Sequence, residues 1–179
     1  MEQSDDLGKV FDTHVHAEFV ARDIDGTMAT MADDPYVTHV PVMTGGSGRD
    51  EMRRFYSSYF IGRWPADTEL KPISRTIGQG RVIDEFVLSF THDREMPAML
   101  PGISPSGRKV ELPTVVVMGV ENGKVTHEHI YWDQGSLLAQ IGLLDPTKLP
   151  LTGAEQARKL LNRRLPSNEL IHRAERTRT

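Results

Sequence analysis

The sequence predicts an α+β domain in which helices cover one face of a strongly curved, mixed or antiparallel sheet. Two observations carry this prediction. Apolar residues recur every three to four positions over residues 5–31 and 49–61, as on amphipathic helices, and every second position in the runs between residues 68 and 133, as on strands. Because the helices come first and the strands then follow one another, the helices form a layer over the sheet. Such a cone-shaped domain encloses a pocket.

The N-terminal part begins with an amphipathic helix over residues 5–31, or with two helices broken near residues 23–26. Asp33-Asp34-Pro35 ends this helix, because proline disfavours helical geometry at the residue before it. We expect a short strand over 36–40, a flexible turn at Thr44-Gly45-Gly46-Ser47-Gly48 and a second helix over 49–61.

Four strands are predicted in the second half, over residues 68–77, 81–92, 109–120 and 124–133. Asn122-Gly123 is a strong hairpin signal because both residues tolerate positive φ. The loop over 94–107 contains Met96, Met99 and Leu100, which would suit either a lid over a hydrophobic substrate or packing between subunits.

The chain ends with a short helix over 136–141 and a tail with a helix over 154–165. We therefore divide it into a domain over 1–145 and an extension over 146–179. The extension is apolar enough to pack on the domain or on a neighbouring subunit.

Composition excludes several classes of protein. The 179 residues suit one domain of ordinary size, and the absence of cysteine excludes disulfides, thiolate zinc sites, iron–sulfur clusters and cysteine nucleophiles. With 21 Lys and Arg against 25 Asp and Glu, the net charge of −4 argues against nucleic acid as a partner. No apolar run is long enough for a membrane span, so we expect a cytoplasmic protein with no membrane partner.

Several motifs resemble a known family. They are Ile103-Ser104-Pro105-Ser106-Gly107-Arg108-Lys109-Val110-Glu111, Asn122-Gly123-Lys124-Val125, Tyr131-Trp132-Asp133 and Gln140-Ile141-Gly142-Leu143. Together with Ala21-Arg22-Asp23-Ile24-Asp25-Gly26-Thr27 and Asp34-Pro35-Tyr36, they resemble SnoaL-like polyketide cyclases of the nuclear transport factor 2-like superfamily, over residues 10–144. The resemblance implies the cone-shaped fold. It leaves the activity open, because this scaffold serves cyclases, isomerases, hydrolases, dehydratases, lyases and non-catalytic binding proteins.

The strand over 124–133 places His127, His129, Tyr131 and Asp133 on one face. The resemblance implies that Asp133 is a general acid or base, although the same aspartate could instead cap the helix that follows. His39 lies at the approximate position of the base in ketosteroid-isomerase relatives, or is a histidine bonded to a neighbouring loop. We predict Asp133, His39 and His129 as catalytic residues.

His14 and Glu18 are polar residues on an otherwise apolar helix stripe, four positions apart, and form either part of a site or a structural pair. On the strand over 81–92 we select Glu85 and His92, which lie on opposite faces unless a bulge intervenes, and expect Arg75 to pair with Glu85. The predicted substrate-binding residues are His14, Glu18, Tyr56, Glu85, His92, Tyr131 and Trp132.

From these residues we predict a lyase or isomerase of the cyclase type that works by general acid/base catalysis without a cofactor or metal. Its substrate would be a hydrophobic or aromatic small molecule bearing a carbonyl or a phenol. A non-catalytic small-molecule-binding protein or oligomeric scaffold is the first alternative, and a metal-dependent hydrolase or oxygenase the second. We expect a homo-oligomer, a dimer or larger.

Overall fold

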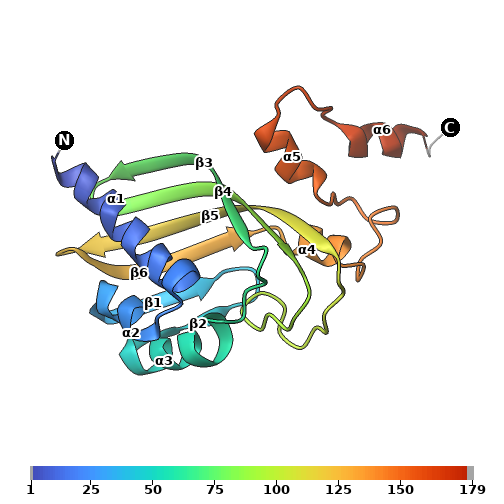
Figure 1. The fold of residues 1–179 in the computed structure, drawn as a ribbon. Helices are drawn as coiled ribbons and strands as arrows, with labels where there is room; N and C mark the ends of the chain where they lie inside the picture. Colours follow the sequence, from blue (N-terminus) through green and yellow to red (C-terminus); the bar gives the residue numbers. More distant parts are fainter. Residues whose placement is uncertain (1, 177–179) are drawn as a thin grey trace.

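A computed structural model describes residues 2–176, with side chains from residue 6 onward, and shows a six-stranded curved sheet with helices on its concave side (Figure 1). The strand order is β2-β1-β6-β5-β4-β3, in which β1 and β6 are parallel and all other neighbours antiparallel. The strands are β1 (Met31–His39), β2 (Thr44–Ser47), β3 (Glu69–Gly78), β4 (Arg81–Thr91), β5 (Lys109–Glu121) and β6 (Lys124–Trp132). The predicted α+β cone is confirmed.

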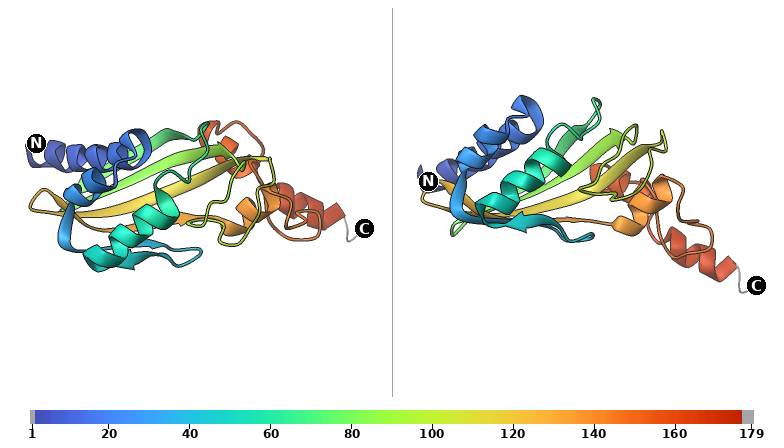
Figure 2. Two further views of the ribbon diagram at one scale, coloured as in Figure 1. Left: turned by 60° about the horizontal axis from the view of Figure 1, so that its bottom comes forward. Right: turned by 90° about the horizontal axis from the view of Figure 1, so that it is seen from below.

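Two groups of helices lie against the same side of the sheet, as Figure 2 shows. The first is α1 (Glu2–Val15), which runs without a break into a π-helical segment, η1 (His16–Ala21), and is followed by α2 (Ile24–Thr30). The second is α3 (Gly48–Phe55), which runs into another π-helical segment, η2 (Tyr56–Phe60). Isolated π-helical turns are rare and occur frequently at functional sites.

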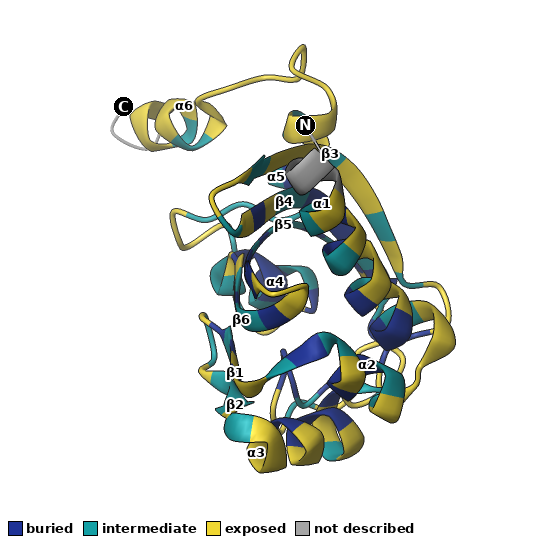
Figure 3. Ribbon diagram, turned by 90° about the vertical axis from the view of Figure 1, so that its left-hand side faces the viewer, coloured by how far each residue is buried: buried dark blue, intermediate teal, exposed yellow. Residues whose placement is uncertain are grey.

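The hydrophobic core lies between these helices and the sheet, where Figure 3 shows the buried faces turned toward one another. Strand β5 shows the underlying pattern: alternate residues Val110, Leu112, Thr114, Val116 and Met118 are buried, while their neighbours are partly exposed. The period of two that predicts the strand is thus the period with which it buries its side chains.

The structure corrects the predicted turn at residues 44–48, because residues 44–47 form an edge strand paired with β1. Gly45 permits this pairing, since a Cβ atom there would lie 1.9 Å from the carbonyl oxygen of Val37. Strand β1 also begins at Met31, earlier than expected. Pro35 is accommodated because the pairing with β6 shifts register between Met31 and Tyr36, and proline is tolerated at such irregularities.

The C-terminal part contains α4 (Gln134–Gln140), α5 (Glu155–Leu161), which packs against β5, and α6 (Glu169–Arg176). The Arg158 side chain of α5 donates to the Glu111 carboxylate of β5 over 2.8 Å. The helix predicted over residues 154–165 covers only Glu155–Leu161 in the structure, and α6 follows it. Within residues 2–176 no helix is both long and apolar enough to cross a membrane.

Asp133 caps α4. Its carboxylate accepts a hydrogen bond from the backbone N–H of Ser136 over 3.0 Å and another from the Gln156 side chain over 3.1 Å. An N-cap oxygen satisfies one of the backbone N–H groups that a helix leaves without an internal partner.

We therefore expect Asp133→Ala to lower the free energy of unfolding by about 1 kcal/mol. Asp133→Ser, which keeps a capping oxygen, should lose only part of this. Urea unfolding of the two variants and the unmodified protein measures the difference. Equal stability of the alanine and serine variants would contradict the capping role.

Candidate functional site

The helices and the concave face of the sheet enclose a cavity of about 210 Å³. Its walls are mostly aromatic and aliphatic, with contributions from every layer. The apolar lining includes Phe11, Phe19, Val37, Phe55, Phe60, Trp64, Phe86, Met99, Val116, Ile130 and Trp132. A larger hollow of about 1210 Å³ lies between α1 and the β3–β4 and β5–β6 turns, but the charged residues that line it are all exposed. We therefore take the smaller cavity as the candidate site.

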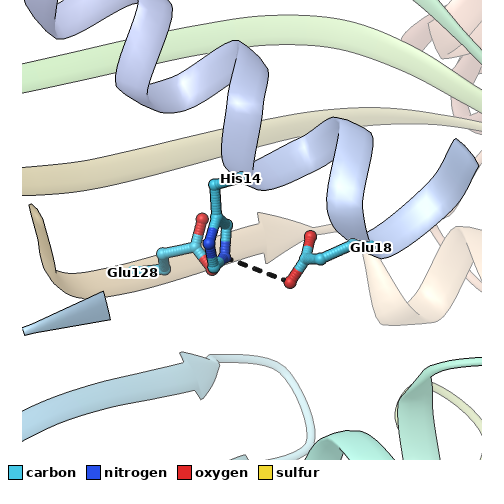
Figure 4. A group of neighbouring side chains, drawn as sticks. All are labelled: His14, Glu18 and Glu128. Carbon is cyan, nitrogen blue, oxygen red and sulfur yellow. Dashed lines mark ion pairs between the residues drawn. The ribbon is translucent and has the colours of Figure 1, made fainter. Parts of the chain in front are cut away.

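One wall of the cavity carries a buried polar cluster, shown in Figure 4. His14 is near the end of α1, Glu18 one turn later in η1, and Glu128 in the middle of β6. The His14 Nε2 atom lies 3.2 Å from Glu18 Oε1 and 3.5 Å from Glu128 Oε2. Tyr56, from η2, places its hydroxyl 3.3 Å from the same nitrogen. The two π-helical segments therefore each supply one oxygen to this cluster.

The contact of Nδ1, the other ring nitrogen of His14, indicates which ring nitrogens carry protons. Nδ1 lies 2.5 Å from Thr30 Oγ1, and the Thr30 hydroxyl donates its own hydrogen to the Thr27 carbonyl over 2.6 Å. Thr30 must therefore accept from Nδ1–H. Nε2 in turn faces two carboxylates, which accept hydrogen bonds, so the cluster favours a His14 ring protonated on both nitrogens.

Electrostatics support the same protonation state. Burial alone would lower the pKa of His14, but the charges of Glu18 and Glu128 outweigh it and raise this pKa from 6.5 to about 10. Burial also raises the pKa of Glu18 above its ordinary value, against the opposing effect of His14. The pKa of Tyr56 is raised as well, by burial and by the two carboxylates, so its hydroxyl stays protonated.

His39, at the end of β1, lies on the cavity wall with different electrostatics. Its ring packs against Phe55, Phe60 and Trp132, with ring centroids 5.5 to 5.7 Å apart. Burial lowers its pKa from 6.5 to about 4, which leaves it neutral near pH 7. Its Nδ1 atom is buried without a hydrogen-bond partner. A buried unpaired nitrogen on a cavity wall is available to a bound ligand.

Charged residues also line the cavity between α1 and the outer strands. Arg75 of β3 binds the carboxylates of Asp84 and Asp12 at 2.6 and 2.8 Å, and its guanidinium lies 4.8 Å from the centre of the Phe11 ring. The pairing of β3 with β4 puts Arg75 opposite Asp84 and Ser74 opposite Glu85. The expected Arg75–Glu85 pair is therefore wrong, because in this register Glu85 lies one position away from the residue that faces Arg75.

The structure brings together five of the residues selected from the sequence. Glu18, His39, Tyr56 and Trp132 line the cavity, and His14 lies directly behind Glu18. Of the two residues on the apolar helix stripe, Glu18 is part of the cavity wall, and His14 forms an ion pair with it from behind that wall.

The face of strand β6 that is turned toward the cavity is the opposite of the one expected. Glu128, Ile130 and Trp132 line the cavity, whereas His129 and Tyr131 point to the outer side of the sheet, where Tyr131 is 43% exposed. There the ring of Tyr36 stacks on His127 at 5.1 Å and lies 5.5 Å from His129. Asp133 lies beyond the end of the strand and caps α4. The polar face therefore faces outward because the face with Ile130 and Trp132 fills the core.

Two further selected residues lie away from the cavity. Glu85 accepts a hydrogen bond from the Ser74 hydroxyl over 3.0 Å on the face of β4 opposite to Asp84 and Phe86, which line the cavity. His92 follows the end of β4, where its Nδ1 accepts from the backbone N–H of Ser106 over 3.3 Å. Its Nε2 is buried without a partner, but it does not reach the cavity.

Glu128 is the residue that sequence reasoning missed. The sequence does contain a pattern that indicates it, because Glu128 is the single carboxylate on the strand face that carries Ile130 and Trp132. The same observation, a charged residue on an apolar face, selects His14 and Glu18 on the helix. In the long loop, Met96, Met99 and Leu100 are buried and Met99 lines the cavity.

We expect the raised pKa of His14 to be visible in the pH dependence of stability. The folded protein binds the His14 proton more tightly than the unfolded chain does, and this difference stabilises the folded state. The contribution is complete below the pKa in the unfolded chain, near 6.5, and is lost as the pH rises through the pKa in the folded protein, about 10. The free energy of unfolding should therefore fall between pH 7 and pH 10, by roughly 3 kcal/mol more than in His14→Gln.

Urea unfolding at both pH values measures this difference, and imidazole nitrogen NMR shifts check it in the unmodified protein. Both nitrogens of His14 should carry protons at pH 8. A ring that loses a proton near pH 6.5 would contradict the arrangement.

Comparisons with known proteins identify the family. The SnoaL-like domain matches residues 13–128, and no curated protein matches the sequence. Among solved structures, the chain is similar to a protein from Jannaschia sp. CCS1 provisionally named a SnoaL-like polyketide cyclase, with 17% identity, a TM-score of 0.65 and coverage of 79% of this chain and 95% of that one.

Two other structures share the fold. One is an NTF2-like protein of unknown function from Burkholderia pseudomallei, with 20% identity, a TM-score of 0.56 and coverage of 76% and 98%. The other is from Kribbella flavida and is provisionally named a ketosteroid isomerase, with 17% identity, a TM-score of 0.52 and coverage of 93% and 94%. At these identities the structures show a common NTF2-like fold, and the match over residues 13–128 shows that this chain belongs to the SnoaL-like domain family.

Proposed function

We propose that the protein is a lyase or isomerase that moves protons on a small hydrophobic molecule, with Glu18 as the base and His39 as the hydrogen-bond donor to the substrate oxygen. The observation that carries the proposal is the composition of the cavity: an apolar, aromatic chamber with a buried carboxylate cluster and a neutral imidazole, whose Nδ1 has no partner, on its walls. General acid/base chemistry needs two such groups with different proton affinities.

Glu18 is suited to accept a proton. Its carboxylate lines the cavity, and burial makes it more basic than an ordinary glutamate. A base whose pKa lies closer to neutrality removes a proton from carbon more readily. When Glu18 takes the proton, the cluster loses a negative charge, and His14 remains paired with the second carboxylate, Glu128. Glu128 therefore keeps the imidazolium compensated throughout the reaction.

His39 is suited to stabilise the negative charge that the proton transfer creates. For this role the neutral ring must carry its single proton on Nδ1, the nitrogen without a partner, and not on the nitrogen that faces the Thr44 carbonyl; Nδ1–H then donates to the oxygen of the substrate carbonyl. In an apolar cavity such a hydrogen bond is worth more than in water. The reaction then breaks a C–H bond beside the carbonyl, passes the proton to the Glu18 carboxylate and leaves an enolate. Return of the proton at another carbon gives isomerisation, and loss of a leaving group from the enolate gives elimination.

The volume of the cavity limits the substrate. A cavity of roughly 150 Å³ accommodates benzene, and the cavity here is about 210 Å³. A single substituted ring bearing a carbonyl or a phenol therefore fits, whereas a molecule of several fused rings would extend through the opening. No cofactor takes part in these steps.

We expect Glu18→Gln to reduce proton exchange at least about a hundredfold, because the amide cannot accept the proton. Unmodified protein would be incubated in D₂O with a panel of single-ring ketones and phenols, and loss of the exchangeable C–H signals followed by ¹H NMR. Asp133→Ser is the control, because its side chain lies outside the cavity, and it should exchange at the unmodified rate. A Glu18→Gln variant as fast as the control would exclude Glu18 as the base.

The pH profile of the exchange rate tests the same assignment. A base must be deprotonated, so the rate should rise with pH through a pKa above that of an ordinary glutamate. His39→Phe should retain the apolar packing but slow exchange, with the midpoint of the profile unchanged. Binding of the panel without exchange in the unmodified protein would instead support a non-catalytic binding protein.

A further inference from the structure

We propose that His14, Glu18 and Glu128 form a binding site for one divalent transition-metal ion of the zinc class, which takes the place of the proton on His14 Nε2. The proposal does not rest on the proposed enzymatic function, because it concerns binding by the metal-free protein and has its own measurement. Within residues 6–176 these three residues form the cluster of His and carboxylate side chains whose candidate ligand atoms all lie within 4.8 Å of one another.

The distances in the cluster fit a metal ion. Zinc binds histidine nitrogen and carboxylate oxygen at about 2.0–2.2 Å, so tetrahedral ligands lie about 3.3–3.6 Å from one another. His14 Nε2 is 3.2 Å from Glu18 Oε1 and 3.5 Å from Glu128 Oε2. The nitrogen and each oxygen already stand at the separation that a shared ion requires. Figure 4 shows the three side chains converging from α1, η1 and β6 on one point.

His14 is oriented in the way that ligating histidines usually are. Such residues donate their other ring N–H to a carboxylate, a carbonyl or another oxygen, which fixes the tautomer and the direction of the ring. Here Nδ1–H donates to Thr30 Oγ1, which is itself held by the Thr27 carbonyl. Nε2 is therefore the nitrogen directed at the two carboxylates, in the position where its lone pair would meet an ion.

Charge balance favours the ion over the proton. With His14 protonated and both carboxylates ionised, the buried cluster carries a net charge of −1. With a divalent ion, neutral His14 and two carboxylates, the net charge is zero. Uncompensated charge is costly in a buried environment, and all three side chains are at most 6% exposed.

An ion could also enter and keep a position open. Glu18 and Glu128 both line the cavity, so the cluster communicates with solvent through it. Three protein ligands leave the fourth tetrahedral position for water or a ligand. An ion in this place occupies the Glu18 oxygen that the proposed proton transfer uses, so the metal-bound and proton-transferring forms exclude one another.

The ligand set also limits the kind of ion. One imidazole nitrogen and two carboxylates suit Zn²⁺ or a neighbouring first-row ion, whereas Mg²⁺ prefers oxygen ligands in an octahedral shell that keeps several waters. A rival site lies on the outer face of the sheet, where the rings of His127 and His129 are 5.2 Å apart and more accessible. The experiment must separate the two.

The test is equilibrium dialysis of the chelator-treated protein against Zn²⁺, and separately against Mg²⁺, followed by metal analysis. We expect one Zn²⁺ per chain and no Mg²⁺. Glu128→Gln, which keeps the size of the side chain, should weaken Zn²⁺ binding at least tenfold. Thr30→Val should weaken it about 10- to 100-fold by releasing the ring of His14. Circular dichroism confirms that each variant is folded.

The matched control is the double variant His127→Ala/His129→Ala, which removes the rival pair and leaves the cluster intact. It should bind one Zn²⁺ with unchanged affinity. Loss of binding in this variant, unchanged binding in Glu128→Gln, or no Zn²⁺ on the unmodified protein would each overturn the proposal. The exchange experiment on the metal-free protein is a separate measurement, so either proposal can fail without the other.

Discussion

The structure depends on one buried imidazole placed between two carboxylates. His14 joins the first helix to the middle of the sheet, because Glu128 belongs to β6 and Glu18 to the helical segment that continues α1. Neither carboxylate could be buried in an apolar core without a positive partner, and the histidine could not hold its charge there without them. The cluster therefore links the first helix to the sheet beside the cavity.

The local backbone changes its geometry beside the same cluster. Helices α1 and α3 both continue into π-helical segments, and each segment supplies an oxygen near His14, from Glu18 in η1 and from Tyr56 in η2. A π-helical turn widens the helix and shifts the positions of the side chains after it. The three side chains of the cluster are buried, so the interactions within it are stronger than they would be at a surface.

The sequence predicts most of the elements because hydrophobic periodicity reports burial directly. It predicts the four long strands and the helices over them, and it selects His14 and Glu18 from their place on an apolar stripe. It does not predict which face of β6 lines the cavity. That strand carries His127, His129 and Tyr131 on one face and Glu128 with Ile130 and Trp132 on the other, and alternation alone makes both faces plausible sites. Packing decides between them, because the larger apolar side chains fill the core.

The edge strand β2 is missed for a related reason. Its glycines are typical of a turn in the local sequence pattern, but Gly45 lies so close to the Val37 carbonyl that a side chain could not fit. Such a contact comes from pairing with β1, which local sequence patterns do not contain. The same holds for the register of β3 with β4, which pairs Arg75 with Asp84 and not with Glu85.

The pKa values of two buried histidines, His39 on the cavity wall and His14 behind Glu18, are thus shifted in opposite directions by their neighbours. His14 gains two carboxylates and its pKa rises to about 10, whereas His39 is buried mainly among aromatic rings and its pKa falls to about 4. Near neutral pH one is a cation and the other a neutral hydrogen-bonding group. In the function that we propose, a substrate between Glu18 and His39 would meet a basic carboxylate on one side and a neutral ring nitrogen on the other. This separation of proton affinities within an apolar chamber is the physical basis of the acid/base chemistry that we propose for the cavity.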